Sequence, residues 1–267
     1  MANRKVAGRT RNQRYRYLLW GAADGVTEPV LEDAVEGGST SPISDPDNVQ
    51  LLLNFNGTDE TSSFTDESNA SRTVNANVGS GPKHDTDQTK FGTASCRLGD
   101  TSPAYLYVDN DTQLHGDSQF TCEAWFRWSD TTTEGSYQGL FGKRQPGLGH
   151  EWQLWHNNGN LQLLAYDAGV IVLNQAIAMT VANDTWYHFA VVRTTAGVWY
   201  AFQDGVALVD GVSESGPPSQ STAPFVIGYD DGTNSRQFHG WVDGFRYVES
   251  EALYTSGFTP STSAPTV

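Results

Sequence analysis

The segment from His150 to His156, HEWQLWH, contains two histidines and a glutamate that could bind a metal. A zinc-protease motif needs two histidines four residues apart on a helix, with a glutamate between them. Here the histidines are six residues apart in a strand-like run. On a strand the two imidazoles would lie about 20 Å apart, at roughly 3.3 Å per residue. The spacing therefore predicts that they do not share a metal ion.

Acidic side chains offer a second kind of chemistry, because glycoside hydrolysis uses two carboxylates held at a fixed separation. The nearest approximation is Glu32, Asp33 and Glu36, which lie in an acidic segment outside any expected strand. Glu123, in TCEAWF, stands alone. The chain also contains neither a Gly-x-Ser-x-Gly motif nor a Gly-x4-Gly-Lys motif. We therefore expect no enzymatic activity.

Carbohydrate binding is the third possibility, since lectin sites combine aromatic side chains with Asn, Asp and Gly in adjoining loops. The candidate residues for a glycan site are Trp155, Asn157, Asn158, Tyr229, Asp230 and Asp231, together with Tyr137 and Asn234. Trp155 and Tyr229 lie near enough to predicted turns to be exposed. The alternative is that these aromatic side chains belong to the core.

Strands must position these loops, and the clearest strands lie between Trp186 and Leu208. In WYHFAVVR both alternating sets of side chains are largely apolar, which is typical of a strand packed on both faces. A turn near Gly197 leads into a second strand, and the pair Asp204-Gly205 is a strong signal for a tight hairpin into a third. The segment therefore predicts three antiparallel strands in a row.

The same pattern continues through most of the chain. From Val49 onward, roughly a dozen short apolar runs are separated by clusters of Gly, Asn, Asp, Ser and Thr. A composition with 12% aromatic residues, 27 Gly and only 2 Met also favours strands and turns. We predict an all-β protein with two antiparallel sheets packed face to face over residues 49–260, a tail at 261–267, and one short helix-like piece near SEALYTSG.

The first 48 residues have a different character. Residues 1–16 carry six basic residues and no acid, whereas residues 17–48 carry seven acids and no base. We interpret the basic part as a docking arm for an acidic partner surface, anchored by Arg4, Lys5, Arg9, Arg11, Arg14 and Arg16 with Tyr15, Tyr17 and Trp20. A solvated disordered tail and nucleic-acid contact are the alternatives. The Gly, Ser and Pro of residues 37–48 indicate a flexible linker.

The net charge of −15 argues against a body that binds nucleic acid and favours calcium, carbohydrate or a basic protein surface. No apolar run is long enough to span a bilayer, and no apolar signal core follows the basic residues. We therefore expect a protein made in the cytoplasm, without membrane insertion. Cys96 and Cys122 are expected to be reduced and buried, and a disulfide between the sheets is the alternative.

A series of short motifs carries a family resemblance. The order LLLNFNG, FTDESN, KFGTAS, YLYV, FTCEAWFRW, TWYHFAVVR, WYAFQDGV, FVIGYDD, FHGWVDGFRYV and ALYTSGFTP resembles laminin G-like, concanavalin A-like jelly-roll domains of the bacteriophage and bacterial type. The resemblance covers about 49–260 and implies the jelly-roll fold, with Trp125, Trp186 and Trp199 in the core. Lectins, adhesion modules, glycosidases and virion parts all use this fold, so function must be argued from the site.

The resemblance also implies a calcium ion, because the family often binds one near the sheet edge. The matching positions are Asp66 in FTDESN and Asp243 in WVDGF, whose carboxylate oxygens suit calcium. Many relatives carry an acid after the second Asp, whereas this chain has Gly244. The alternative is that both residues stabilise turns. No cofactor is otherwise expected.

These features together predict a non-enzymatic structural protein of a bacteriophage virion, either a capsid decoration or a tail-associated protein. The arm would dock on capsid or tail proteins, and the acidic lectin-like domain would be displayed outward in several copies, as a homo-oligomer or on a particle. The alternative is an adhesin that binds host surface glycans. A glycoside hydrolase is a third reading, for which the chain offers no carboxylate pair.

Overall fold

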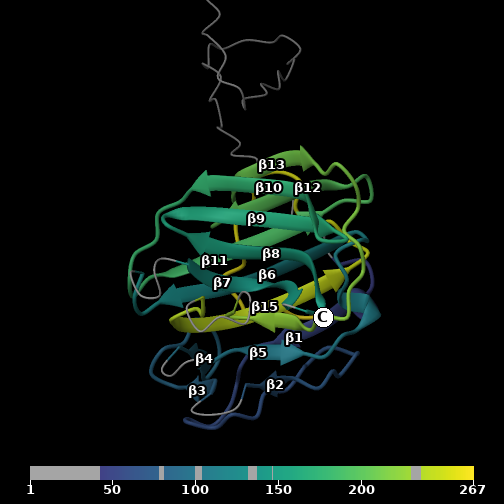
Figure 1. Cartoon of the computed structure of the whole chain (residues 1–267). Helices are drawn as coiled ribbons and strands as arrows, with labels where there is room; N and C mark the ends of the chain where they lie inside the picture. Colours follow the sequence, from purple (N-terminus) through teal and green to yellow (C-terminus); the bar gives the residue numbers. More distant parts are fainter. Residues whose placement is uncertain (1–42, 78–80, 100–103, 132–136, 146, 230–235) are drawn as a thin grey trace, which may run out of the picture. The chain divides into compact units, whose positions relative to one another are not determined.

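A computed structural model describes residues 43–77, 81–99, 104–131, 137–145, 147–229 and 236–267 of the chain (Figure 1). The residues predicted to dock, from Arg4 to Trp20, lie outside the described residues, and so do Asp230, Asp231 and Asn234. The described part of the chain contains two short 3-10 helices, η1 (Pro46–Asn48) and η2 (Thr112–Leu114). Neither of these helices could cross a membrane.

The strands of the described structure form two antiparallel sheets, which are joined by loops (Figure 1). The first has the order β13-β12-β11-β6-β15-β4-β3, with β1 also paired to β15. Its strands are β1 (Val49–Leu53), β3 (Lys83–Asp85), β4 (Ser95–Leu98), β6 (Phe120–Trp128), β11 (Trp186–Arg193), β12 (Val198–Gln203), β13 (Val206–Ser213) and β15 (Gly240–Glu249). We call it the eight-stranded sheet.

The second sheet has the order β10-β9-β8-β7-β14-β5-β2. Its strands are β2 (Asn75–Ala76), β5 (Leu106–Val108), β7 (Tyr137–Gln145), β8 (Gly149–Asn157), β9 (Asn160–Asp167), β10 (Val170–Ala178) and β14 (Phe225–Ile227). We call it the seven-stranded sheet. The prediction of an all-β sandwich of two antiparallel sheets is confirmed.

The main core lies between the sheets and is rich in aromatic rings. Phe120 of β6 packs against Trp152 of β8 with ring centroids 4.8 Å apart, and Phe126 packs against Phe141 of β7 at 6.0 Å. All four rings are buried. Each such side chain removed from water stabilises the fold by about 1.5–3 kcal/mol. The core therefore fixes both sheets, and with them the side chains on their outer faces.

The predicted three-strand meander is present as β11, β12 and β13, paired in that order. The hairpin between β12 and β13 turns at Asp204 and Gly205, whose φ angles are +51° and +76°. Positive φ at both central residues is the signature of the type I′ turn that Asp-Gly favours. The local sequence therefore fixes this turn.

Both faces of β11 are buried, as its sequence predicts. Phe189 and Val191 belong to the main core, whereas Val192 belongs to a second cluster on the outer face of the sheet. Tyr254 and Phe258 complete this second cluster and stack with centroids 3.7 Å apart. The prediction of a helix near SEALYTSG is wrong, because this segment is irregular and bends at Thr255 and Ser256.

Two predictions about buried side chains have different outcomes. Trp199 is fully buried, but Trp125 and Trp186 are only half-buried, so their assignment to the core is wrong. Both lie where the outer face of the eight-stranded sheet is only partly covered. Cys96 and Cys122 are free and fully buried, as predicted, and burial raises the pKa of both thiols.

Candidate functional site

The outer face of the seven-stranded sheet carries the candidate site, and strand alternation explains which side chains reach it. On β5, Leu106 and Val108 are buried in the main core. Tyr105 and Tyr107 therefore lie on the opposite face, because successive side chains of a strand alternate. Val226 of β14 reaches the same face, since its two neighbours on that strand fill the core.

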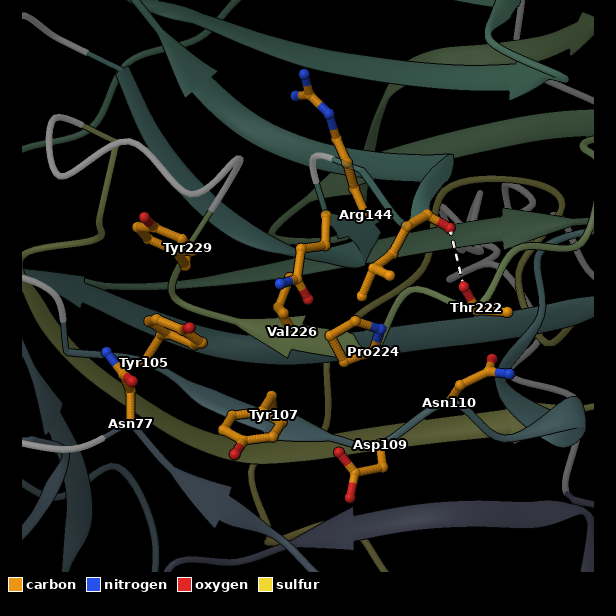
Figure 2. A pocket seen from close by; sticks show the side chains of 12 residues that line it. Asn77, Tyr105, Tyr107, Asp109, Asn110, Arg144, Thr222, Pro224, Val226 and Tyr229 are labelled. Carbon is orange, nitrogen blue, oxygen red and sulfur yellow. Dashed lines mark hydrogen bonds between the residues drawn. The ribbon is translucent and has the colours of Figure 1, made fainter.

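These side chains surround a hollow of about 290 Å³, which we call the aromatic hollow (Figure 2). Tyr229 stacks on Tyr105 with ring centroids 4.4 Å apart and planes only 6° apart. Tyr107 lies 6.0 Å from Tyr105, centroid to centroid. The residues that line the hollow are Asn77, Tyr105, Tyr107, Asp109, Asn110, Arg144, Gln145, Leu148, Thr222, Pro224, Val226 and Tyr229.

Polar groups for a ligand adjoin the tyrosines. Within the described ranges, the hydroxyls of Tyr105 and Tyr107 and the exposed carboxylate of Asp109 make no hydrogen bond to the protein. Burial raises the pKa of Tyr105, with a contribution from Tyr107, so its hydroxyl remains a donor at neutral pH. Arg144 is held in place, because its Nε donates to Nδ1 of His150 at 2.8 Å.

Asn110 is positioned by a buried lysine. The Nζ of Lys143 donates to Oδ1 of Asn110 at 2.8 Å and to the carbonyl of Asp111 at 3.3 Å. Burial lowers the pKa of Lys143 to about 8, although the charges of Glu151 and Asp111 oppose this shift. The amide nitrogen of Asn110, which lines the hollow, remains available as a donor.

A second hollow of about 780 Å³ adjoins the first, and we call it the polar hollow. The two hollows share Asn110, Leu148 and Thr222. The residues that line the polar hollow are Asn110, Thr112, His115, Gly147, Leu148, Gly149, His150, Ala168, Gly169, Ser219, Gln220, Ser221 and Thr222. Most of these lining residues carry a side-chain hydroxyl, amide or imidazole.

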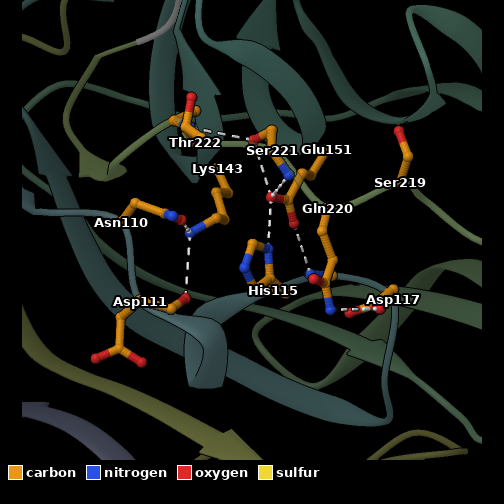
Figure 3. Close-up of polar contacts among 12 residues, drawn as sticks. Asn110, Asp111, His115, Asp117, Lys143, Glu151, Ser219, Gln220, Ser221 and Thr222 are labelled. Atoms are coloured by element: carbon orange, nitrogen blue, oxygen red, sulfur yellow. Dashed lines mark hydrogen bonds and ion pairs between the residues drawn. The ribbon is translucent and has the colours of Figure 1, made fainter.

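The wall of the polar hollow is held by Glu151 of β8, which is completely buried (Figure 3). Its Oε1 accepts hydrogen bonds from Nδ1 of His115 at 2.7 Å and from the backbone and hydroxyl of Ser221 at 2.8 and 2.9 Å. Its Oε2 accepts from the backbone of Gly116 at 3.0 Å. One carboxylate thus connects two loops that are about a hundred residues apart in the sequence.

The structure separates the two aromatic residues predicted to be exposed in a glycan site. Tyr229 lines the aromatic hollow, but its stacking on Tyr105 leaves it only 7% exposed. Trp155 is also 7% exposed and lines neither hollow, because it packs on the outer face of β8 against Tyr137 and Leu164. The prediction that both side chains are exposed is therefore wrong.

The loop residues predicted to bind a glycan are placed only in part. Asn157 and Asn158 lie at the turn between β8 and β9, where Asn157 donates to Oε1 of Gln162 at 2.6 Å. Neither asparagine lines a hollow. Asp230 and Asp231 follow Tyr229 directly but lie outside the described residues.

Asp66, the first predicted calcium ligand, is surrounded by donors. Its Oδ1 accepts from the backbone of Leu52 and Ser68, at 2.9 and 3.0 Å, and its Oδ2 accepts from the backbone of Arg72 at 2.7 Å. The bond to the residue two positions ahead is an Asx-turn. Calcium requires a cage of oxygen ligands instead.

Asp243, the second predicted ligand, has a separate set of partners. Its Oδ2 accepts from the backbone of Lys90 and Phe91, both at 2.9 Å, and its Oδ1 accepts from Gly244 at 2.8 Å. Burial raises the pKa of Asp243 to about 7. In the described part of the chain, no three acids, histidines or cysteines are grouped as metal ligands. Asp66 and Asp243 therefore do not fit a calcium site.

The main side chains of the site are not among those predicted from the sequence. Tyr105 and Tyr107 lie in the predicted strand AYLYV, of which Leu106–Val108 form β5, and Asp109 follows this segment directly. Its alternation of Tyr with Leu and Val is the signal that could have indicated an aromatic outer face. Glu151 lies within the strand β8, as HEWQLWH predicts, but nothing in the sequence identifies Gly116 and Ser221 as its partners.

Comparison with known proteins agrees with this architecture. The model of the Laminin_G_3 family, concanavalin A-like lectin/glucanases superfamily, matches residues 100–253. No curated protein is similar enough in sequence to count as a match.

Several solved structures have the same fold at low sequence identity. The binding domain of Paraclostridial Mosquitocidal Protein 1 is 17% identical, with a TM-score of 0.61 over 79% of this chain and 50% of that one. The binding domain of botulinum neurotoxin serotype D is 14% identical, with a TM-score of 0.59 over 78% of this chain and 50% of that one. The chain thus spans about half the length of both toxin structures.

Domain 4 of AbnA, a GH43 extracellular arabinanase from Geobacillus stearothermophilus, was solved in complex with arabinotriose. It is 15% identical, with a TM-score of 0.57 over 82% of this chain and 96% of that one. At such identities the likeness shows a shared fold, and the function must be argued from the side chains of the site.

Proposed function

Because the chain belongs to the concanavalin A-like lectin/glucanases superfamily, we propose that its sandwich is a carbohydrate-binding domain. The aromatic hollow is the observation that carries this proposal. Tyr105 and Tyr107, which are only partly buried, offer apolar ring surface to a sugar, while Tyr229 supports Tyr105 from behind. The hydroxyls of Tyr105 and Tyr107 and the carboxylate of Asp109 offer hydrogen bonds. The fold is also that of an arabinanase domain solved with arabinotriose, which supports a glycan as the ligand.

The charge of the site favours a neutral glycan. The aromatic hollow is lined by one acid, Asp109, and one base, Arg144, so its lining has no net formal charge, whereas the whole chain has a net charge of −15 that would repel an acidic sugar. We assign no hydrolysis to this site. Retaining and inverting glycosidases both need two carboxylates, and Asp109 is the single acid among the described residues that line the aromatic hollow.

Replacing Tyr107 by alanine is expected to weaken glycan binding about tenfold or more, because it removes an aromatic face worth about 1.5–3 kcal/mol when covered. A glycan array identifies the ligand, and calorimetry then measures the affinity of the wild type and the variant. Tyr200→Ala is the matched control, because Tyr200 is a half-buried tyrosine on β12 of the other sheet. An array without any bound glycan, or equal losses in both variants, would contradict the proposal.

We also propose that the N-terminal arm attaches this domain to a bacteriophage particle, where several copies would be displayed. The supporting observation is the abrupt charge segregation of the first 48 residues, with six basic residues before position 17 and seven acids after it. Such an arm suits an acidic surface on a capsid or tail protein. Display in many copies would convert weak glycan contacts into avidity for a host surface.

Attachment is tested by co-sedimentation of the full-length protein, and of a version starting at Val49, with particles that lack the protein. We expect only the full-length chain to sediment, in an amount that decreases as salt is added, because exposed charge pairs are screened. Binding of both versions, or of neither, would contradict docking through the arm. Neither of these results would bear on the carbohydrate-binding proposal, which is tested separately by the glycan array and calorimetry.

A further inference from the structure

The two hollows adjoin each other at Asn110, Leu148 and Thr222, which line both of them, and we call the two together the groove. We propose that the ligand is a linear oligosaccharide that spans both hollows, and that His115 accepts a hydrogen bond from one of its hydroxyl groups in the polar hollow. This inference rests on the proposed carbohydrate binding. The aromatic hollow alone, at about 290 Å³, is at the small end of ligand sites, which measure about 300–1,000 Å³. The polar hollow is more than twice as large.

His115 is a buried polar side chain in the wall of the polar hollow, with only 4% of its surface exposed. Its Nδ1 must carry a proton, since the carboxylate of Glu151 at 2.7 Å can only accept. In the neutral ring this leaves Nε2 as an acceptor. Within the described residues, Nε2 makes no hydrogen bond to the protein, and it is not completely shielded from solvent. A sugar hydroxyl is the kind of donor that it can bind.

The neighbouring groups extend this polar surface and are fixed in advance. Ser221 is held by Glu151, and the side-chain amide of Gln220 donates to Oδ2 of Asp117 at 3.0 Å. The hydroxyl of Thr222 donates to the carbonyl of Leu148 at 3.3 Å, at the junction of the two hollows (Figure 2). A wall that is already ordered loses little entropy when a ligand binds. The groove therefore offers aromatic faces at one end and hydrogen bonds at the other.

The test compares the affinities of disaccharides and hexasaccharides of the arabino-, cello- and malto- series by calorimetry. In the wild type we expect the hexasaccharide of the recognised series to bind at least tenfold more tightly than its disaccharide. Thr112→Trp places a bulky ring on the exposed wall of the polar hollow. We expect this variant to bind the hexasaccharide no more tightly than the disaccharide, and to bind the disaccharide with the affinity of the wild type.

Two further variants separate recognition from folding. His115→Asn retains a donor for Glu151 but removes the Nε2 acceptor, so we expect a weaker hexasaccharide complex with an unchanged disaccharide complex. Thr89→Trp is the matched control, since Thr89 is exposed and lines neither hollow. Melting temperatures within a few degrees of the wild type show that each variant is folded.

The outcomes distinguish this inference from the proposed function. Equal affinities for disaccharide and hexasaccharide would overturn the extended groove while leaving carbohydrate binding in place. If the hexasaccharide still binds more tightly than the disaccharide in both Thr112→Trp and His115→Asn, the assignment of the polar hollow would be overturned. Failure of every oligosaccharide to bind the wild type would overturn both proposals.

Discussion

Replacing Glu123 by alanine is expected to lower the free energy of unfolding by about 3–5 kcal/mol, as breaking a buried ion pair does. Glu123 of β6 is 4% exposed and accepts from Nε of Arg246 at 2.9 Å, from Nε2 of His188 at 3.2 Å and from the hydroxyl of Tyr254 at 2.8 Å. The guanidinium also donates through Nη2. Without the carboxylate, these groups stay buried and lose their shared partner.

This effect should depend on pH in a defined direction. Burial raises the pKa of Glu123, but Arg246, His188 and Tyr254 outweigh burial and lower it to about 2. An acid whose pKa is lower in the folded state stabilises the fold above its usual pKa of 4.5. That contribution, about 3 kcal/mol at roughly 1.4 kcal/mol per pH unit, is lost as the pH falls from about 4.5 towards 2.

Urea denaturation at pH 7 and pH 3 measures both effects. We expect the difference between wild type and Glu123→Ala to be largest at pH 7 and to shrink at pH 3. Glu67→Ala is the matched control, because Glu67 is an exposed glutamate whose side chain accepts one bond, from Asn54. Its expected change is within about 0.5 kcal/mol at either pH. A loss that is the same at both pH values would contradict the role given to the ion pair.

Replacing Glu151 by alanine is expected to destabilise the protein by at least about 3 kcal/mol and to abolish glycan binding in the polar hollow. The substitution leaves four donors without their acceptor, two of them buried, from His115 and Gly116, and two part-buried, from Ser221. Each unsatisfied buried group costs about 1–3 kcal/mol, although relaxation of the loops recovers part of this. The loops carrying these donors form the wall of the groove.

Thermal denaturation measures the loss of stability, and amide hydrogen exchange locates it. We expect the backbone amides of Gly116 and Ser221 to exchange much faster in Glu151→Ala, while amides in the meander β11 to β13 keep their protection relative to the global stability. The same experiment on Glu67→Ala provides the control. Unchanged exchange at Gly116 and Ser221 would show that Glu151 does not hold the groove wall.

Short-range patterns in the sequence were enough to predict the elements of the fold. Alternation of apolar residues identifies strands such as Trp186–Arg193, and Asp204-Gly205 determines a tight turn through its own backbone preferences. These signals lie within a few neighbouring residues. The same signals fail where the outcome depends on a distant partner. SEALYTSG is irregular and not helical, and its Tyr254 packs with Phe258 on the eight-stranded sheet.

Exposure of single aromatic side chains could not be predicted for the same reason. Trp155 and Tyr229 both lie close to turns, yet Tyr137 and Tyr105 cover them from other strands. Conversely, Trp125 and Trp186 lie in apolar strands but on a face that the rest of the chain leaves partly open. Burial is a property of the partner surface, which local sequence does not contain.

Local patterns are enough to predict the all-β class, the meander β11 to β13 at one edge of the eight-stranded sheet and the charge contrast between the first 16 residues and the rest of the chain. The position of the proposed groove depends on long-range contacts instead. Tyr107, His115, Arg144 and Ser221 meet because β14 pairs with both β5 and β7, and because Glu151 joins two distant loops. Strand pattern is a local consequence of side-chain alternation, whereas convergence at a groove depends on long-range pairing that fixes each strand's neighbours.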